Sequence, residues 1–291
     1  DGEADNLNRG GCPEEIVRAA ERALAGRRTE LTLEMHERYY YVIATPVFSE
    51  NQITGSVVIA LDTTEREQRE ALRREFSANV SHELKTPLTS ISGFAELMKE
   101  GLVEADKMRE LAGDIYKECG QLIALIDDIM KLSRLDEAAE NEVAPESVDL
   151  YDLSQDILES LQPAAAKRSV SLHLEGEKQT ILGVWRILHE MVYNLCDNAI
   201  KYNHENGHVW INVKKEGNEA VLVVEDDGIG IPPEHQERIF ERFYRVDKSH
   251  SKEVGGTGLG LSIVKHAVRQ QNGKIEPVSY THLTLPTILR V

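Results

Sequence analysis

Two long stretches with apolar residues at every third or fourth position constrain the fold of this chain most. In the first, from about Glu65 to Glu100, the apolar residues share one helical face: Leu72, Phe76, Val80, Leu84, Leu88 and Ile91. The second runs from Asp106 to about Asp136 and keeps the pattern over about four heptads. Gly101 and a short loop separate them, so we expect an antiparallel helical hairpin. Because a lone hairpin leaves its apolar stripe uncovered, we expect two copies to form a dimeric four-helix bundle.

The segment Ser81-His82-Glu83-Leu84-Lys85-Thr86-Pro87 lies in the first of these stretches. His82 falls off the apolar stripe, so its imidazole should point partly to solvent. Pro87 has no N–H for the helical hydrogen-bond ladder, and we expect it to kink the helix near the histidine. A single histidine on a helix is most often an ordinary surface residue. Its interpretation therefore depends on the rest of the chain.

Composition narrows the classes of partner. The chain has 291 residues, enough for two or three compact domains, and 41% of them are hydrophobic. A net charge of −17 argues against nucleic acid or an anionic membrane surface as a general partner. The three cysteines are scattered without metal-ligand spacing, as is typical of reduced cytosolic thiols. No apolar run approaches the roughly 20 residues of a membrane helix. Because the chain starts at Asp1 without a methionine, we expect a fragment.

Residues 1–64 are expected to form a small α/β segment. Residues 13–25 have a helical pattern, residues 51–55 form a turn, and 29–35, 38–47 and 56–61 have strand patterns. Asp62 or a threonine after it is a candidate cap for the long helix that follows. Strands that lead into a long helix through a D-x-T turn resemble the C-terminal half of a PAS sensor domain. We therefore expect a partial PAS-like sensor segment here.

The C-terminal half alternates short strands and helices. Residues 137–146 are acidic and broken by a proline, so we expect a linker there. Strands are expected at 147–150, 170–174, 180–182, 208–213 and 220–225. Helices are expected at 153–166, 185–202, 233–240 and 259–271. These spacings differ from a regular parallel βαβ arrangement and favour an α/β sandwich over residues 147–277.

One of these helices, expected at 185–202, carries a polar face that repeats amides. Glu190, Asn194, Asn198 and Lys201 follow one another at helical spacing. One interpretation is a solvated surface. The other is a surface for metal and phosphate, because Mg²⁺ takes few protein oxygens together with substrate phosphates. The amide oxygen of Asn194 would then be a ligand that does not repel phosphate, and Lys201 would neutralise charge.

Two glycine-rich segments flank a basic one. Asp226-Asp227-Gly228-Ile229-Gly230-Ile231 follows an expected strand, where a carboxylate can accept a hydrogen bond from an adenine amino group. Gly255-Gly256-Thr257-Gly258-Leu259-Gly260-Leu261 leads into a helix, whose free N–H groups favour phosphate. The segment between them indicates a polyanion site, although the Walker pattern is absent. Its basic residues are Arg238, Arg242, Arg245, Lys248 and Lys252.

Over residues 65 to about 277 the chain resembles the sensor histidine kinases of two-component signalling. The motifs stand in family order: S-H-E-L-K-T-P-L, N-L-C-D-N-A-I-K-Y, D-D-G-I-G-I, R-F-Y-R-V-D and G-T-G-L-G-L-S-I-V-K. The resemblance implies a dimerisation and histidine phosphotransfer hairpin at 65–136. It also implies a catalytic ATP-binding domain at 147–277 of the GHKL type, which DNA gyrase and MutL share. With the PAS-like segment, the chain looks most similar to kinases of the phosphate-regulon type.

The resemblance assigns roles to individual residues and implies ATP and Mg²⁺ as cofactors. His82 would be the phosphoacceptor, because imidazole is nucleophilic near neutral pH, and Glu83 would take or orient the proton of one ring nitrogen. Asn194 would hold Mg²⁺. The other nucleotide contacts would be Asn198, Lys201 and Arg245 near the phosphates, Asp226 and Tyr202 at the adenine, and Gly256, Gly258 and Gly260 in the lid. Further nucleotide contacts would be Gly228, Gly230 and Leu261.

The implied activity is autophosphorylation of His82 and transfer of the phosphoryl group to an aspartate of a response regulator receiver domain. Thr86 shares a helix face with Glu83, and in this family such a threonine is associated with dephosphorylating the regulator. The alternative is that Thr86 only precedes the expected kink and takes no part in the chemistry. The family further implies a homodimer through the hairpin, with this chain as the cytoplasmic portion of a parent protein anchored in the cell membrane by an upstream region.

Two other classes of function stay open. One is a GHKL-type ATPase that forms no phosphohistidine, although such an enzyme has no reason to carry the His82 motif. The other is a catalytically silent sensor scaffold, which predicts eroded nucleotide loops.

The chain departs from the family pattern at two places. Val184 stands where the family usually has an acidic residue. Residues 278–287 resemble one reading frame of a sequencing-library adapter, so 278–291 is a candidate non-native tail, and the ATP-binding sheet would then lack an edge. The other interpretation of the tail is a divergent final strand.

Overall fold

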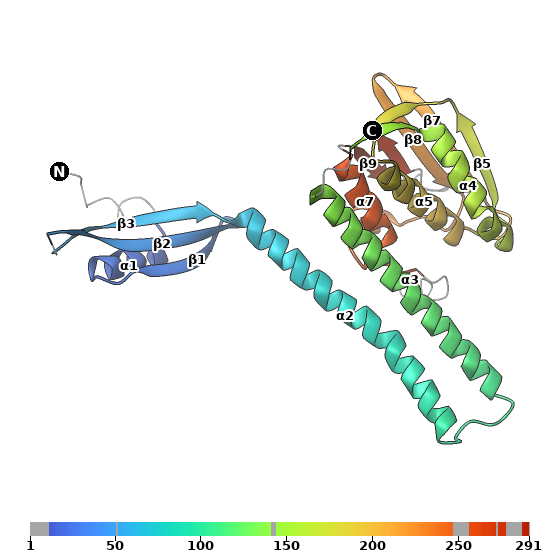
Figure 1. The fold of residues 1–291 in the computed structure, drawn as a ribbon, viewed down its shortest axis with the longest axis horizontal. Coiled ribbons are helices and arrows are strands. Elements are labelled where there is room, and N and C mark those ends of the chain that lie inside the picture. The colour runs from blue at the N-terminus through green and yellow to red at the C-terminus, as the bar shows by residue number, and fades with distance from the viewer. Residues whose placement is uncertain are drawn as a thin grey trace. The chain divides into compact units, whose positions relative to one another are not determined.

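The computed structural model describes residues 12–50, 52–140, 144–246, 256–271, 273–277 and 287–290. These residues belong to two compact units, Asp1–Val80 and Ser81–Val291, which are considered separately (Figure 1). The division falls within the long helix α2, Thr64–Lys99. Among the described residues, no helix combines the length and the apolar character of a membrane span.

The first unit is a three-stranded antiparallel sheet with one helix against it. The helix α1 spans Glu14–Leu24, and the strands β1 (Thr29–Met35), β2 (Arg38–Ser49) and β3 (Gln52–Asp62) pair in chain order. Ala19 and Ala23 of α1 are buried against Ala44 of β2. These elements confirm the predicted helix and strands. However, β3 begins at Gln52, within the expected turn. The pairing of β2 with β3 continues there, with a shift of register between Val47 and Phe48.

The sheet leads into α2 through the predicted cap. The backbone N–H of Thr64 donates to Oδ1 of Asp62 at 2.9 Å, which satisfies one N–H at the start of the helix. The backbone N–H of Thr63 donates to the backbone oxygen of Tyr39 at 2.8 Å. The backbone N–H of Tyr39 in turn donates to Oγ1 of Thr64 at 2.9 Å. The strand and the helix start are therefore connected by several bonds. The assignment of this unit to the PAS class stays a prediction.

In the second unit, the remainder of α2 and the helix α3 (Met108–Glu140) run in opposite directions, as the sequence predicts (Figure 1). Gly101, with φ +68°, lies just after α2, in a conformation that glycine adopts easily. The helix α3 ends at Glu140 and not near residue 136, so it takes up the first part of the expected linker. Pro87 lies inside α2 without ending it, and the predicted kink stays a prediction.

The rest of the second unit is an α/β sandwich. Its sheet has the order β5-β7-β8-β10-β9, in which only β5 and β7 pair in parallel, and β4 pairs with β6 separately. The strands are β4 (Glu146–Asp149), β5 (Ser171–Gly176), β6 (Thr180–Gly183), β7 (His208–Glu216), β8 (Glu219–Asp226), β9 (Lys274–Pro277) and β10 (Thr287–Arg290). The helices α4 (Leu150–Lys167), α5 (Trp185–Lys201) and α7 (Gly260–Gln270) form the other layer (Figure 1).

Alternate residues of β7 and one face of α5 meet in the core of the sandwich. Val209, Ile211 and Val213 are fully buried, as are Leu188 and Met191 of α5. Side chains of a strand alternate between the two faces of a sheet, so the buried residues of β7 define the face that the helices cover. This packing fixes which face of α5 is left to line a cavity.

The segment 233–240 differs from its predicted helix. Only the short 3₁₀ helix η1, Pro233–His235, forms there. The backbone N–H groups of Gln236 and Arg238 bond to carbonyls three residues back, at 3.3 and 2.9 Å. This tighter winding does not extend into an α-helix.

The strand β10 lies inside the sheet, between β8 and β9. Leu289 pairs with Leu222 on one side and with Ile275 on the other. The sheet therefore does not lack an edge at this place, contrary to what a non-native tail implied. Residues 278–286 lie outside the described residues, and the origin of the tail stays a prediction.

We predict that Leu289→Pro destabilises the protein by about 2 kcal/mol or more, because proline removes a ladder N–H from an interior strand. Urea unfolding measures the change, and Leu289→Val is the matched control that keeps the N–H. Equal unfolding midpoints for the proline variant and the control would contradict the pairing of β10.

Candidate active site

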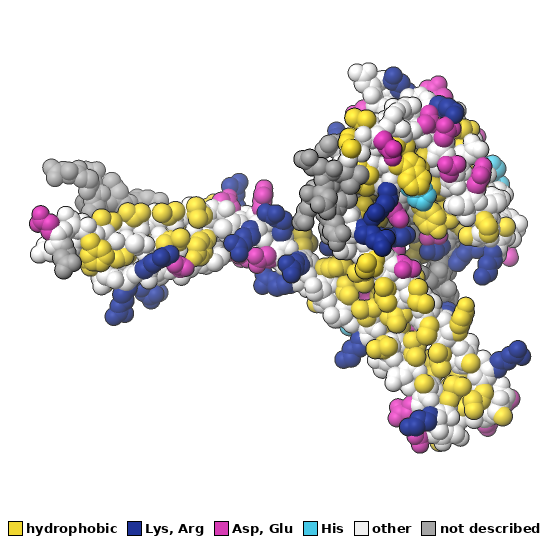
Figure 2. Space-filling view, in the orientation of Figure 1, with side chains coloured by type: hydrophobic (Ala, Val, Ile, Leu, Met, Phe, Trp, Pro, Cys, Tyr) yellow, Lys and Arg dark blue, Asp and Glu magenta, His cyan; other side chains and the backbone are white. Residues whose placement is uncertain are grey.

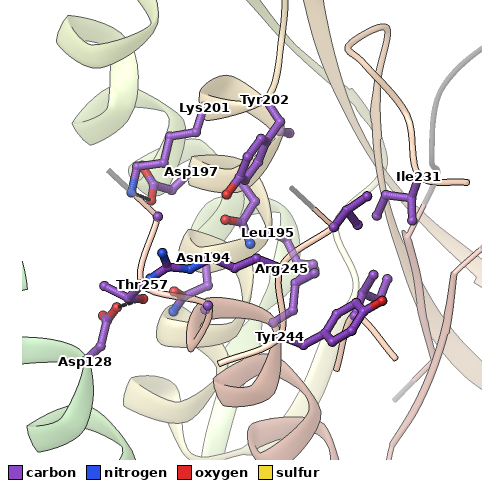
Figure 3. Close-up of a pocket in the computed structure, with 18 of the residues that line it drawn as sticks. Asp128, Asn194, Leu195, Asp197, Lys201, Tyr202, Ile231, Tyr244, Arg245 and Thr257 are labelled. Carbon is purple, nitrogen blue, oxygen red and sulfur yellow. Dashed lines mark hydrogen bonds and ion pairs between the residues drawn. The ribbon is translucent and has the colours of Figure 1, made fainter. Parts of the chain in front are cut away.

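A cavity of about 400 Å³ lies between α5, the loops after β8 and the segment before α7, with α3 on one side (Figure 3). Its volume is in the range of small-ligand sites, roughly 300–1,000 Å³. It brings together most of the nucleotide contacts predicted from the sequence. These are Asn194, Asn198, Lys201, Tyr202, Asp226, Gly230, Arg245, Gly256, Gly258, Gly260 and Leu261.

Gly228 is the predicted contact that does not line this cavity. A Cβ at Gly228 would stand 2.4 Å from the backbone oxygen of Tyr202, which no side chain tolerates. The Gly228 N–H donates to Oδ1 of Asp226 at 3.0 Å. Its role is therefore to let the loop close tightly on Tyr202 while it holds the carboxylate in place.

Asp226 is a largely buried carboxylate at the end of β8. The pKa of Asp226 is raised to about 6, chiefly by burial and in addition by the nearby Asp227 and Glu225, while the hydrogen bond from Gly228 opposes the shift. An ionised carboxylate that is partly shielded from water is a strong acceptor for a ligand N–H, because its electrostatic interactions are less screened there. This geometry suits the predicted contact with an amino group of adenine.

Asn194 is oriented by a hydrogen bond from its amide nitrogen, and within the part of the chain that the structure describes its amide oxygen accepts none. The residue is only 7% exposed, and its Nδ2 donates to the backbone oxygen of Glu190 at 2.6 Å. Its Oδ1 faces the start of α7, where a Cβ on Gly260 would lie 3.3 Å from it. Among the described residues, no group of three or more His, Cys, Asp or Glu side chains could hold a metal. The amide oxygen of Asn194 is a ligand type that Mg²⁺ accepts together with ligand phosphates.

The ends of the predicted polar face are paired within the protein. Lys201 Nζ lies 2.6 Å from Asp197 Oδ2, one helical turn earlier, and both line the cavity. Glu190 Oε2 lies 3.2 Å from Lys131 Nζ of α3, which also lies over the Tyr193 ring at 5.5 Å. The face is thus neither a simple solvated surface nor purely a ligand surface.

The helix α3 supplies a wall of the cavity that the sequence did not predict. Its contributing residues are Ala124, Asp127, Asp128 and Lys131. The described residues before α7, 256–259, are called the lid segment. Its Thr257 donates its hydroxyl to Asp128 Oδ2 at 2.6 Å (Figure 3). Burial raises the pKa of Asp128 although this hydrogen bond opposes it. In the sequence these charges looked like the solvated face of a bundle helix, so no local signal could have placed them here.

Among the described basic residues of the segment 238–252, Arg245 lines the cavity, where it extends towards Thr257 (Figure 3). Its side chain is only 13% exposed, and Nη2 lies 3.5 Å from Glu83 Oε2 on α2. Arg238, by contrast, pairs with Glu241 and stacks over Tyr244. Lys248 and Lys252 lie outside the described residues. The predicted positive segment is therefore only partly a ligand surface.

The lid segment before α7 is held against the segment at Phe243. Gly258 has φ +74°, and a Cβ there would lie 2.9 Å from the backbone of Phe243. The Phe243 N–H donates to Gly258 O at 2.8 Å, and Phe243 itself has φ +64°. A non-glycine residue at positive φ is strained, and such strain gathers at functional sites.

His82 precedes Glu83, which lines a second, smaller cavity, but His82 itself is not among the lining residues. Its side chain is 78% exposed, which confirms the predicted exposure, and Nδ1 lies 3.6 Å from Glu83 Oε1, longer than a hydrogen bond. Thr86 donates its hydroxyl to the backbone oxygen of His82 at 3.2 Å. The cavity of about 50 Å³ is lined by Glu83, Thr86, Pro87, Glu118, Gln121 and Leu125 from the hairpin and by Arg245, Gly256 and Thr257.

Two family models match this chain. The His Kinase A (phospho-acceptor) domain matches residues 72–138. The Histidine kinase-, DNA gyrase B-, and HSP90-like ATPase matches residues 183–287. These matches fall on the hairpin and on the domain that holds the cavity.

Curated relatives are sensor kinases. The sensor-like histidine kinase SenX3 of Mycolicibacterium smegmatis is 38% identical over 221 residues, which are 76% of this chain and 57% of the relative. The sensor protein kinase WalK of Staphylococcus aureus is 34% identical over 238 residues, 77% of this chain and 54% of the relative. The chain thus spans about half the length of these relatives.

Solved structures agree with the fold. One is the histidine kinase ThkA in complex with the response regulator protein TrrA. The match spans 98% of this chain and 85% of the ThkA chain, with 22% identity and a TM-score of 0.63. Full-length ShkA in complex with AMPPNP covers 75% of this chain and 45% of that chain, with 26% identity and a TM-score of 0.54.

We predict that Asp226→Asn stabilises the nucleotide-free protein at pH 7 by about 1–2 kcal/mol. The folded-state pKa lies above the ordinary value, so the protein loses stability as pH rises from about 4 to about 6, and the full loss is present at pH 7. Below the unfolded-state pKa of about 4, both states are protonated and the difference should vanish.

Urea unfolding of the wild type and of Asp226→Asn, at pH 7 and at about pH 3, measures this difference. A destabilised Asn variant at pH 7, or the same gain at both pH values, would contradict the burial argument.

Proposed function

Because the chain belongs to the sensor histidine kinases of two-component systems, we propose that it uses ATP to phosphorylate His82 and then passes the phosphoryl group to an aspartate of a response regulator. One observation carries the proposal. The cavity predicted for the nucleotide and the small cavity at Glu83 and Thr86, the neighbours of His82 on α2, share Arg245, Gly256 and Thr257 as lining residues. A phosphate bound at Gly256 and Thr257 would therefore lie close to Glu83, the residue after the acceptor His82.

We propose that the residues of the larger cavity position the nucleotide. Asp226 accepts the adenine amino group, Tyr202 packs beside the ring, and the N–H groups at the start of α7 face the phosphates. The orientation of the Asn194 amide supports its assignment as a ligand of Mg²⁺, which would neutralise phosphate charge when bound. The similar kinase ShkA has been solved with AMPPNP, which supports ATP as the nucleotide.

At the acceptor, exposure and orientation of the imidazole are the main requirements. Glu83 stands on the Nδ1 side of the ring, which leaves Nε2 to attack the γ-phosphate. The carboxylate would hold and then take the proton of Nδ1. The high exposure of His82 lets a separate receiver domain reach the phosphohistidine afterwards. Catalysis then rests on positioning and charge neutralisation.

The hairpin carries the surface that a dimer requires. Hydrophobic side chains gather along it, and several are more exposed than a monomer normally leaves them (Figure 2). They include Leu88, Tyr116, Ile123, Ile126 and Met130. We propose that two chains bury these residues in a four-helix bundle.

Thr86 supports a second activity at the same site. It lines the small cavity one helical turn from His82, and its hydroxyl keeps acceptor capacity after it donates to the His82 backbone. We propose that this hydroxyl orients a water that dephosphorylates the response regulator.

The two alternative classes are less well supported. A GHKL-type ATPase without phosphohistidine would not need Glu83 and Thr86 to line a cavity with lid residues. A silent scaffold would not need Asp226 with its raised pKa or the oriented Asn194 amide.

We further propose that this chain is the cytoplasmic portion of a membrane-anchored sensor of the phosphate-regulon type, which fits the similarity to SenX3.

We predict that the wild-type protein incorporates acid-labile label from γ-³²P-ATP and Mg²⁺ and that His82→Gln abolishes this label. His36→Asn, which removes an exposed histidine from the other unit, should keep it. ATP turnover without protein labelling would favour the ATPase alternative, and absent nucleotide binding would favour the scaffold.

We predict that Ile123→Glu converts the dimer into a monomer, because it buries an unpaired charge in the bundle. Ile123 is 61% exposed in the single chain. Sedimentation velocity measures the change. The control Leu182→Glu alters a residue of β6 that is 72% exposed and should leave the dimer intact. A dimeric Ile123→Glu variant would speak against the hairpin as the interface.

A further inference from the structure

We infer that autophosphorylation occurs in cis, so that the catalytic domain of each chain phosphorylates His82 of that same chain. This inference rests on the proposed function and adds which chain of the dimer supplies the acceptor. It follows from how the ATP-binding domain is seated on its own hairpin.

The first observation is the packing between the domain and the end of its own α3. Leu132 and Leu135 are buried, and α3 contacts α7. The side-chain amide of Gln270 donates to the backbone oxygen of Leu135. The domain is therefore held by apolar burial and by a hydrogen bond to the helix that precedes it in the chain.

The second observation is the pair of polar contacts at the mouth of the cavity. Thr257 of the lid bonds to Asp128 at 2.6 Å, and Glu190 of α5 pairs with Lys131 at 3.2 Å. Asp128 and Lys131 are one turn apart on α3, so one face of that helix contacts both sides of the cavity. These contacts orient the lid relative to the hairpin, beyond keeping the two parts close.

The third observation is the reach of Arg245 to α2. Its guanidinium lines the large cavity and lies 3.5 Å from Glu83, the residue after His82. The lid end of the large cavity and the small cavity beside Glu83 and Thr86 share three lining residues. Within one chain, the place predicted for the γ-phosphate thus adjoins the acceptor helix of that chain.

The length of the connection agrees with this arrangement. The helix α3 ends at Glu140 and β4 begins at Glu146. A chain of this length spans at most about 20 Å when fully extended. The domain is therefore tethered near the end of its own α3, where the contacts above hold it.

The step itself needs no further reactant. A ring nitrogen of His82 forms a bond to the γ-phosphorus while the bond from that phosphorus to the bridging oxygen breaks. The electron pair of the broken bond leaves with ADP. The proton of the other ring nitrogen passes to the Glu83 carboxylate of the same chain.

Forced heterodimers test the inference. Two differently tagged chains, one with His82→Gln and the other with Asn194→Ala, are co-expressed and purified through both tags. In cis neither chain can label itself, so we expect at least a tenfold loss of γ-³²P label relative to the wild-type homodimer. Label on the Asn194→Ala chain would overturn the inference, because it requires transfer in trans.

A second heterodimer gives the opposite readout. It pairs a wild-type chain with a chain that carries both substitutions, and we expect label on the wild-type chain at about half the homodimer level. An unlabelled wild-type chain would overturn the inference. A wild-type homodimer that takes up no label would overturn the proposed function and this inference with it. That outcome differs from the others, in which the wild-type homodimer is labelled.

A crosslink tests the docking independently of catalysis. Asp128→Cys and Thr257→Cys are introduced together in a chain with Cys12→Ser and Cys119→Ser, while the buried Cys196 is kept. After oxidation, we expect a disulfide within one chain and a monomer-sized band on a non-reducing gel. A dimer-sized band that reducing agent removes would show that the lid contacts the partner's hairpin, and would overturn the inference. Failure to form a disulfide would contradict the docked arrangement.

Discussion

The contact between the lid and the hairpin is the interaction on which the proposed chemistry depends. Neither part forms the site alone. The lid segment and α5 line the cavity, while Asp128 and Lys131 of α3 close one side of it. Arg245 then connects this cavity to Glu83 on α2. If this contact is broken, an exposed histidine and a nucleotide cavity remain, but they have no fixed relation to each other.

The cavity and the acceptor histidine differ in their exposure to solvent. In the cavity, Asp226 and Asp128 are carboxylates whose pKa values burial raises, so the fold retains charged groups at a cost in stability. At the hairpin, His82 stays largely in solvent. A kinase that must deliver its phosphoryl group to a second protein needs both properties. In the proposed function, the groups of the cavity would bind one small molecule, and the exposed imidazole could be reached by the nucleotide and then by the second protein.

Much of this site could be predicted from the sequence, because its residues belong to local patterns. Asn194, Asn198 and Lys201 repeat at helical spacing, and the glycines precede a helix or follow a strand. Helical periodicity likewise predicted α2 and α3. The rest depends on contacts between segments far apart in the chain. Charged residues such as Asp128 and Lys131 look the same in sequence whether they meet solvent or the lid. The missing helix at 233–240 and the place of β10 depend in the same way on tertiary packing and on strand pairing.

The most direct test of the central claim is to locate the phosphoryl group after incubation with ATP and Mg²⁺. Mass spectrometry of the intact protein and of its peptides, kept at neutral to basic pH to preserve phosphohistidine, provides this measurement. The account predicts one phosphoryl group per chain, on the peptide that contains His82 and no other. A phosphoryl group on a different histidine, or a nucleotide-bound protein that stays unmodified, would contradict it.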